Sequence, residues 1–131
     1  MRVFVDANVL FTAAYSPKGK AATLLELIPE LIITSDYAAE EARRNIEAKS
    51  PAASDVLKKI LGKIEIFSSV QSGSCPIRLP EKDQPIFLSA LTAKATHLLT
   101  GDLKDFGPHM NQPKKSCGII IQTVSEFLAA L

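Results

Sequence analysis

The chain has 131 residues, of which 47% are hydrophobic, and its 15 basic and 14 acidic side chains give a formal net charge of +1. This length and composition fit one globular domain with a buried core, and they exclude a strongly basic protein that coats nucleic acid. The apolar runs are much shorter than the roughly 20 residues that cross a bilayer, and Asp6 interrupts the apolar run that a secretory signal needs, so we expect a single cytoplasmic domain over residues 1–131 and no membrane partner.

Five short apolar runs, rich in β-branched and aromatic residues, predict buried β-strands. They cover residues 2–5, 31–34, 64–67, 96–100 and 118–121. Segments with helical spacing cover residues 21–28, 37–48, 53–61, 85–95 and 123–131. Strands that are apolar on both faces and alternate with helices are typical of a parallel sheet between two helix layers. The predicted fold class is therefore α/β, a three-layer α/β/α domain with a parallel sheet of about five strands, and loops are predicted at 68–80 and 106–116.

Acidic residues follow the first and the fourth predicted strands. Asp6 ends the first strand, two residues before Asn8. Asp102 follows the fourth strand directly after Gly101, which would let the backbone turn sharply, and Asp105 comes three residues later. Functional groups in parallel sheets gather outside the carboxyl ends of the strands. We therefore expect these acids to meet at one edge of the sheet.

Further acids lie at the starts of two predicted helices. Glu40 and Glu41 are one to two turns into the helix over 37–48, where one of them can point at the strand ends. Asp83 precedes a helix that starts near Pro85. Each acid also has a simpler interpretation: Asp6 and Asp83 can be helix N-caps, and the glutamates can be solvated first-turn charges. The number of acids expected at one edge favours a site over separate caps.

Four carboxylates that converge on one pocket repel one another unless a cation neutralises them. Oxygen ligands with few histidines suit Mg²⁺ or Mn²⁺, which favour phosphate-bearing substrates. Such an ion activates water and stabilises the charge on phosphate oxygens. The residues therefore predict a metal-dependent enzyme that hydrolyses phosphodiesters.

The same residues carry a resemblance to a known family. The sequence resembles PIN-domain ribonucleases, which include the toxins of many prokaryotic toxin–antitoxin pairs, and the resemblance covers nearly the whole chain. It rests on the opening VFVDANVL at residues 3–10, on Lys82 and Asp83 ahead of a helix, and on LLTGD at residues 98–102. The resemblance implies RNA as the substrate, cleavage that leaves a 5′-phosphate, and an antitoxin protein as a possible partner.

The resemblance also assigns roles to residues. The metal-site acids would be Asp6, Asp83 and Asp102, with Asp105 as an outer or water-mediated contributor and Asn8 and Thr100 as supporting polar groups. The family places an apolar residue directly after its glutamate and another further along that helix. Glu41, followed by Ala42 and then Ile46, fits this pattern better than Glu40, which stays the alternative. The expected catalytic set is Asp6, Glu41, Asp83 and Asp102.

Two other functions fit parts of the sequence. A non-catalytic RNA-binding or scaffold module with this fold would use its acids as helix caps. A small-molecule phosphatase would use Asp6 as its nucleophile, although Asn8 stands where that class has a second aspartate. The aliphatic stretch at residues 24–28 is expected in the core, and any surplus exposed part would make a homodimer the simplest assembly.

Overall fold

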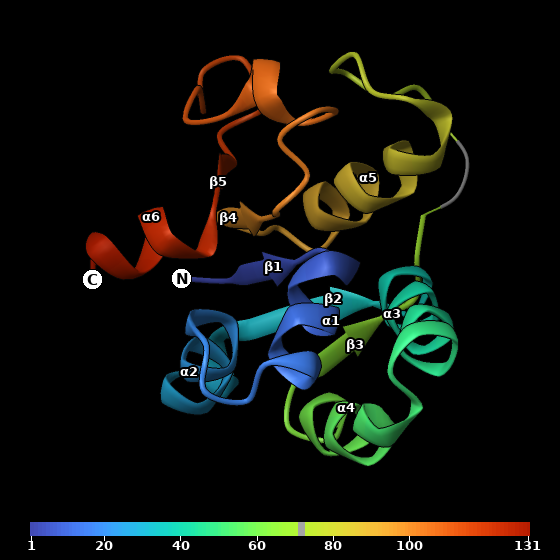
Figure 1. Ribbon diagram of the computed structural model, residues 1–131. Helices are drawn as coiled ribbons and strands as arrows, with labels where there is room; N and C mark the ends of the chain where they lie inside the picture. The colour runs from blue at the N-terminus through green and yellow to red at the C-terminus, as the bar shows by residue number, and fades with distance from the viewer. Residues whose placement is uncertain (71–72) are drawn as a thin grey trace.

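The computed structural model describes residues 1–70 and 73–131, in which five parallel strands form one sheet (Figure 1). The strands are β1 (Val3–Val5), β2 (Ile32–Ser35), β3 (Glu65–Phe67), β4 (His97–Leu99) and β5 (Ile120–Gln122). They lie in the order β3-β2-β1-β4-β5, and each neighbouring pair is parallel. The predicted parallel sheet of five strands is therefore confirmed.

Helices cover both faces of the sheet. They are α1 (Ala7–Tyr15), α2 (Lys20–Leu27), α3 (Asp36–Lys49), α4 (Ser54–Leu61), α5 (Gln84–Thr92) and α6 (Val124–Ala129). Short 3₁₀ turns are η1 (Pro29–Leu31), η2 (Pro51–Ala53), η3 (Glu81–Asp83) and η4 (Gly107–His109). Helix α1 packs against α2, α3 and α4 on one side, and α5 lies on the other side, against β2 (Figure 1). This arrangement confirms the three-layer α/β/α prediction.

The centre of the sheet is the centre of the core. All three residues of β1 are fully buried, and so are Leu98 and Leu99 of β4. The prediction of five buried strands is wrong for β3, where Glu65 is exposed and Ile66 is 42% exposed. Strand β3 ends the sheet and pairs only with β2, so its side chains lack the cover that the central strands have.

Helix α1 was not among the elements predicted from the sequence. Its buried side, which includes Leu10 and Ala13, packs within its helix layer, while Thr12 and Tyr15 are exposed. The helix has no charged side chain, so the 3.6-residue alternation of apolar and polar residues that reveals a surface helix is weak. The structure shows that this helix begins directly after Asp6.

Strands β1 and β4 bring their following residues together. The chain passes from β1 to β2 on one side and later returns to β4 on the other side, so the strand order reverses at the β1–β4 junction. The Asp6 amide donates to the Leu99 carbonyl at 3.0 Å, which joins the two carboxyl ends. Such a junction is where open α/β sheets bind ligands.

The structure tests the loop predicted before α5 and the absence of a membrane-spanning helix. In the loop predicted over 68–80, positions 71–72 lie outside the described residues, and Ile77 and Leu79 are buried against the core. No helix within the described residues combines the length and apolarity needed to cross a membrane.

Candidate metal centre

Asp6 is held at the end of β1 by three neutral donors. It is the N-cap of α1, and its Oδ1 accepts a hydrogen bond from the Ala7 amide at 2.7 Å. Its Oδ2 accepts from the Thr100 hydroxyl at 2.8 Å and from the Asn8 amide nitrogen at 3.2 Å. The helix-cap interpretation of Asp6 is therefore correct, and the same carboxylate also connects β1 to the residue after β4.

The charge of Asp6 is costly in this position. Its side chain is 5% exposed, and burial raises the pKa of the carboxyl to about 6. Hydrogen bonds from Thr100 and Ala7 act in the opposite direction, while the charges of Glu41 and Asp102 raise the pKa further. Asp6 therefore lies within electrostatic reach of two of the acids that the sequence assigned to the same site.

Gly101 fits beside Asn8 for a reason that the sequence did not predict. Its amide donates to Asn8 Oδ1 at 2.8 Å, and a Cβ atom at this position would lie 3.3 Å from that oxygen. Its φ is not in the left-handed region, where the positive-φ glycines of the described chain are Gly73 and Gly118. Close approach to Asn8, rather than a sharp turn, is therefore what favours glycine here.

Three aspartates from two separate segments lie together next to this junction. One carboxylate oxygen each from Asp83, Asp102 and Asp105 lie within 4.8 Å of one another, and we call these residues the acid triad. Asp102 Oδ1 accepts from the Asp105 amide at 3.0 Å, so the loop after β4 holds two of the three in a fixed relation. Asp6, which was expected to join this group, is not one of the three.

Asp83 enters the triad from the start of α5. It occupies the N-cap position of that helix, but its side chain makes no capping hydrogen bond, so the cap interpretation is wrong for this residue. Burial, followed by a hydrogen bond with Asp105, raises the pKa of Asp83 to about 7. The same hydrogen bond, with the help of Lys82, lowers the pKa of Asp105. Of the two carboxyls, Asp83 therefore holds a proton more readily than Asp105.

Lys82 supplies the positive charge nearest the triad. Its Nζ lies 3.2 Å from Asp105 Oδ2 and 3.4 Å from Asp83 Oδ2, and the contact with Asp105 raises the pKa of the ammonium. From the sequence, Lys82 counts only toward the resemblance and has no assigned role. The signal available was its position directly before Asp83, which does not reveal where a long side chain will point.

The two candidate glutamates on α3 point to different surroundings. Ser35 begins the helix by accepting a hydrogen bond from the Ala38 amide. Glu40 pairs with Arg43 on the helix surface, and both side chains are 50% exposed. Glu41 is half-buried, and its charge raises the pKa values of both Asp6 and Tyr37. Glu41 is therefore the glutamate that acts on the acidic edge, while its catalytic role stays a prediction.

The acid triad has the chemistry of a site for a hard divalent cation. Its potential ligand atoms are all carboxylate oxygens, as Mg²⁺ and Mn²⁺ prefer. Oxygens on opposite sides of a bound Mg²⁺ are about 4 Å apart, so a spread of 4.8 Å needs only a small inward movement. The ammonium of Lys82 already lies as a cation beside two of these three carboxylates. The residues present fit such an ion.

Comparison with known proteins identifies the fold. No protein-family model matches the chain, and no curated protein sequence does. A chain of the VapBC2 complex from Rickettsia felis, solved bound to a promoter DNA fragment, superposes with a TM-score of 0.66 and 18% identity over 94% of this chain and 98% of that one. The sarcin-ricin loop cleaving toxin VapC20 of Mycobacterium tuberculosis gives 0.61 and 12% identity over 82% of this chain and 94% of that one. The RRP44 PIN domain of T. brucei gives 0.57 and 12% identity over 98% of this chain and 79% of that one.

The chain has the PIN-domain fold. The resemblance seen in the sequence is thereby confirmed at the level of fold, because identities this low carry the architecture and not the activity. In this fold the acids lie near the ends of β1 and β4.

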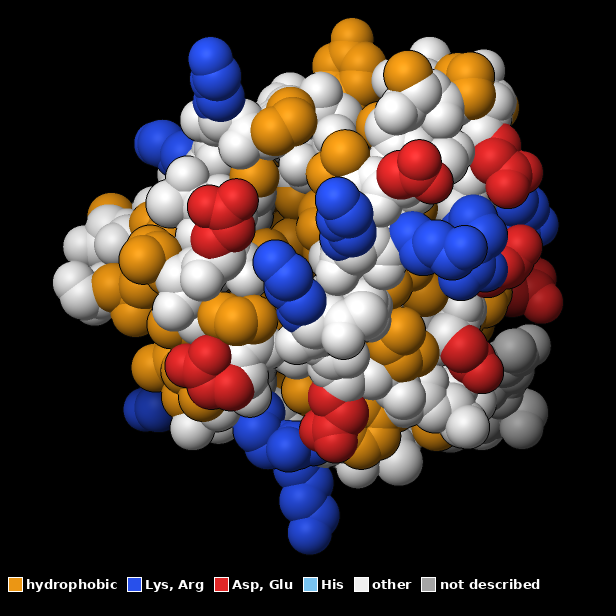
Figure 2. Space-filling model, turned by 90° about the horizontal axis from the view of Figure 1, so that it is seen from below, with side chains coloured by type: hydrophobic (Ala, Val, Ile, Leu, Met, Phe, Trp, Pro, Cys, Tyr) orange, Lys and Arg blue, Asp and Glu red, His pale blue; other side chains and the backbone are white. Residues whose placement is uncertain are grey.

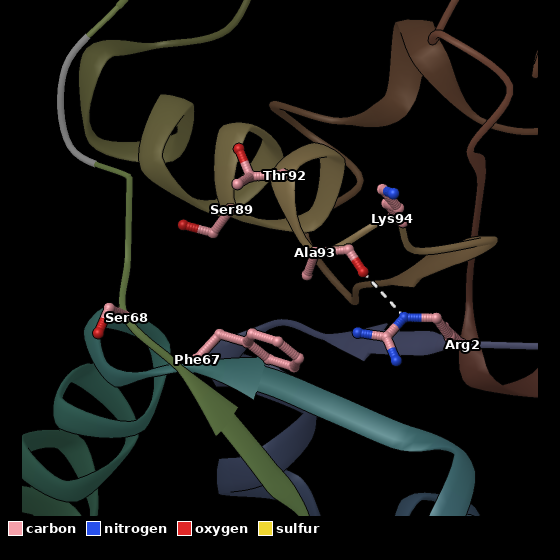
Figure 3. A pocket seen from close by; sticks show the side chains of 7 residues that line it. All are labelled: Arg2, Phe67, Ser68, Ser89, Thr92, Ala93 and Lys94. Atoms are coloured by element: carbon pink, nitrogen blue, oxygen red, sulfur yellow. Dashed lines mark hydrogen bonds between the residues drawn. The ribbon is translucent and has the colours of Figure 1, made fainter.

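A separate cavity of about 370 Å³ opens between the start of β1, β3 and the end of α5 (Figure 3). Figure 3 shows the Arg2 guanidinium between the Phe67 ring and the Ala93 carbonyl, which accepts from Arg2 Nε at 2.8 Å. None of the predicted site residues lines this cavity. Arg2 thus ties the amino end of β1 to α5 away from the acid triad.

The domain also presents a mixed surface over its α1, α2 and α4 layer. Figure 2 shows basic and acidic side chains interspersed with apolar ones on this face. Such alternation agrees with the near-neutral total charge and gives little long-range steering for a polyanion on this side.

Proposed function

We propose that this PIN domain is an endoribonuclease that hydrolyses RNA phosphodiester bonds with the help of Mg²⁺ or Mn²⁺. The observation that supports this most strongly is the acid triad, in which two chain segments place one oxygen from each of three carboxylates within 4.8 Å, next to the edge where the central strands β1 and β4 end. Carboxylates this close repel one another, and their repulsion costs stability unless a cation or a proton relieves it.

Each acid has a role in the proposal. Asp83, Asp102 and Asp105 hold the ion, which when bound supplies Lewis-acid chemistry that activates water and neutralises phosphate oxygens. Asp6 is kept in one orientation by Thr100 and Asn8, and it adds a fixed negative charge next to Asp102. Glu41 adds a second such charge from α3. Thr100 also accepts from the Asp102 amide at 3.1 Å, so one hydroxyl aligns both halves of the site.

The substitution Asp102→Asn tests the proposal. The asparagine would keep a carbonyl oxygen for the Asp105 amide, so the loop should fold as before while the site loses one negative ligand. We expect cleavage of a single-stranded RNA in Mg²⁺ to fall by about 10²-fold or more. Asp55→Asn, on the exposed surface of α4, makes the same change of charge and should leave cleavage unchanged. Cleavage by Asp102→Asn at the wild-type rate, in purified protein and resistant to EDTA, would contradict the proposal.

We further propose that the domain is the toxin of a toxin–antitoxin pair, with an antitoxin protein as its partner and the cytoplasm as its location. Support comes from the similar structures, among which are VapBC complexes from Rickettsia felis and nontypeable Haemophilus influenzae. Co-expression with the small DNA-binding protein expected in the adjacent reading frame should restore growth that the domain alone inhibits. Growth inhibition that such a neighbour does not relieve would count against the pairing. The homodimer expected from the sequence stays a prediction, to be checked by light scattering.

A non-catalytic module is the second candidate, and the side-chain cap that Asp6 gives to α1 favours it. In that case the acids would serve folding alone, and titration calorimetry with Mn²⁺ would show no saturable site. Asp83 argues against this alternative, because it sits at a helix start without capping it.

A further inference from the structure

Lys82 is placed against the acid triad by its backbone as well as by its charge. It lies in the 3₁₀ turn η3 directly before α5, and its carbonyl accepts a hydrogen bond from the Tyr37 hydroxyl at 2.8 Å. The side chain crosses to the loop after β4, where Nζ contacts one oxygen of Asp105 and one of Asp83. The backbone is thus anchored to α3, while the side chain is 69% exposed and able to move.

The charged side chains around the acid triad show which of them neutralises it. Within residues 1–70 and 73–131, Lys82 is the basic side chain that forms ion pairs with triad members. Lys104 is close in sequence, between Asp102 and Asp105, yet it is exposed and forms no ion pair within the same residues. The neutralisation that the described chain itself offers the triad therefore comes from one long, flexible side chain.

We propose that Lys82 takes the place of the divalent ion in the ion-free protein and leaves that place when the ion binds, so that Lys82 sets the ion affinity of the site. The inference rests on the proposed metal site and concerns its regulation. A divalent ion would bind oxygens of the same carboxylates that Lys82 contacts, at about 2 Å, and two cations at one set of carboxylates repel each other strongly. Release of Lys82 is easy, because ion pairs of exposed ammonium groups contribute little stability.

Two consequences follow for a chain in which this ammonium is removed. The divalent ion no longer competes with an ammonium for the acid triad, so the affinity of the triad for the ion should rise. The ion-free protein loses the counter-charge of the triad, so it should become less stable until the ion is added. A lysine with a purely structural role would not produce this opposite pair of effects, because its loss would weaken the site and the fold together.

The substitution Lys82→Met tests the inference, because methionine keeps much of the stem and removes the charge. Titration calorimetry with Mn²⁺ should show about fivefold tighter binding than wild type, the factor that corresponds to one exposed ion pair. Without the ion, the midpoint of thermal unfolding at pH 7.5 should fall by about 2–4 °C. Lys82→Arg keeps the positive charge, and Lys104→Met removes a nearby charge without a triad contact, so both should stay within about twofold of the wild-type affinity.

Other results would overturn the inference. Equal or weaker Mn²⁺ binding by Lys82→Met, or equal tightening by Lys104→Met, would show that Lys82 does not compete for the site. If wild type binds Mn²⁺ and cleaves RNA while Lys82→Met gains no affinity, this inference alone fails. If neither wild type nor any variant binds Mn²⁺ saturably, the proposed metal site fails and takes the inference with it.

Discussion

Asp6 and Asp83 both precede a helix at the same edge of the sheet, yet their surroundings differ. The oxygens of Asp6 accept hydrogen bonds from Ala7, Thr100 and Asn8, all of which are neutral. Asp83 makes no cap, and its partners are an ammonium and another carboxyl. Neutral donors offset part of the cost of the Asp6 charge and fix its orientation, whereas a cluster of carboxylates needs a proton or a cation. We therefore expect the acid triad to determine how strongly the domain depends on a divalent ion. The contacts of Asp6 should determine how the side chains of the site are oriented.

The largest expected effect comes from Asp83→Asn. Because the triad loses a ligand, RNA cleavage should fall by about a thousandfold, beyond the 10–100-fold typical of groups that only support metal ligands. The free energy of unfolding of the ion-free protein at pH 8 should not fall, since burial of the Asp83 charge is unfavourable there. Cleavage assays measure the loss of activity, and urea unfolding measures the unfolding free energy. A large loss of stability with little loss of cleavage would break the comparison.

The pH dependence of stability should reveal the cost of Asp6. Its pKa is raised from 3.8 to about 6, so between about pH 4 and pH 7 the folded chain holds more protons than the unfolded chain. Stability of the ion-free protein should therefore fall as the pH rises through this window, by about 2–3 kcal/mol from Asp6. The groups that act on Asp6 are Thr100 and Ala7, which oppose the shift, and Glu41 and Asp102, which add to it.

Urea unfolding in EDTA at pH 5 and pH 7.5, for wild type and Asp6→Asn, isolates this contribution. The lowered pKa of His97 acts in the opposite direction over part of the window, so the difference between the two slopes is the relevant quantity. Asp105, with its lowered pKa, contributes only at lower pH. If the unfolding free energy changed equally with pH in the two proteins, burial of the Asp6 charge would carry no measurable cost.

Thr100→Val should separate orientation from ion binding. The buried hydroxyl donates to Asp6 and accepts from the Asp102 amide, so its loss leaves buried polar groups unpaired and should cost about 2 kcal/mol of unfolding free energy. Thr34→Val is the matched control, since this buried hydroxyl donates to the Val5 carbonyl and, among the described residues, makes no further side-chain hydrogen bond, so its loss should cost about 1 kcal/mol. Chemical denaturation measures both. Equal costs for the two valines would argue against a special role for Thr100.

The smallest effect is expected on α3, where two adjacent glutamates serve as controls for each other. Glu41→Gln removes a charge that acts on Asp6 and should lower cleavage about tenfold, as for a group in the outer surroundings of a metal site. Glu40→Gln removes a surface ion pair with Arg43 and should change cleavage by less than about twofold. A larger loss of cleavage in Glu40→Gln than in Glu41→Gln would assign the site glutamate to Glu40.

Much of the architecture could be predicted because buried strands leave a plain trace in the sequence. The runs that end at Val5 and near Leu99 are apolar because both faces of the central strands are covered, and this also places Asp6 and Asp102 at one edge. Helix α1 escaped prediction because it has no charged side chain, which leaves the helical period of its sequence weak. Strand β3 has the residue types of a buried strand, and only its place at the end of the sheet exposes it.

The site was predictable as a set of acids but not as an arrangement. Sequence placed the acids near the correct edge, yet it could not separate Asp6 from the acid triad, since that depends on which donors lie within hydrogen-bond distance. Nor could it foresee that Lys82 reaches Asp105, a contact between residues 23 positions apart that follows from the packing of α5 beside the loop after β4. Side-chain contacts between loops are fixed by the assembled fold rather than by local pattern.

The most direct test of the account is the position of a bound ion. Crystals soaked in Mn²⁺ should give an anomalous difference peak among the carboxylates of Asp83, Asp102 and Asp105, with the Lys82 ammonium displaced from them. A saturating soak that leaves this place without a peak, or that shows Mn²⁺ bound only elsewhere on the domain, would contradict the claim that the acid triad is a divalent metal site.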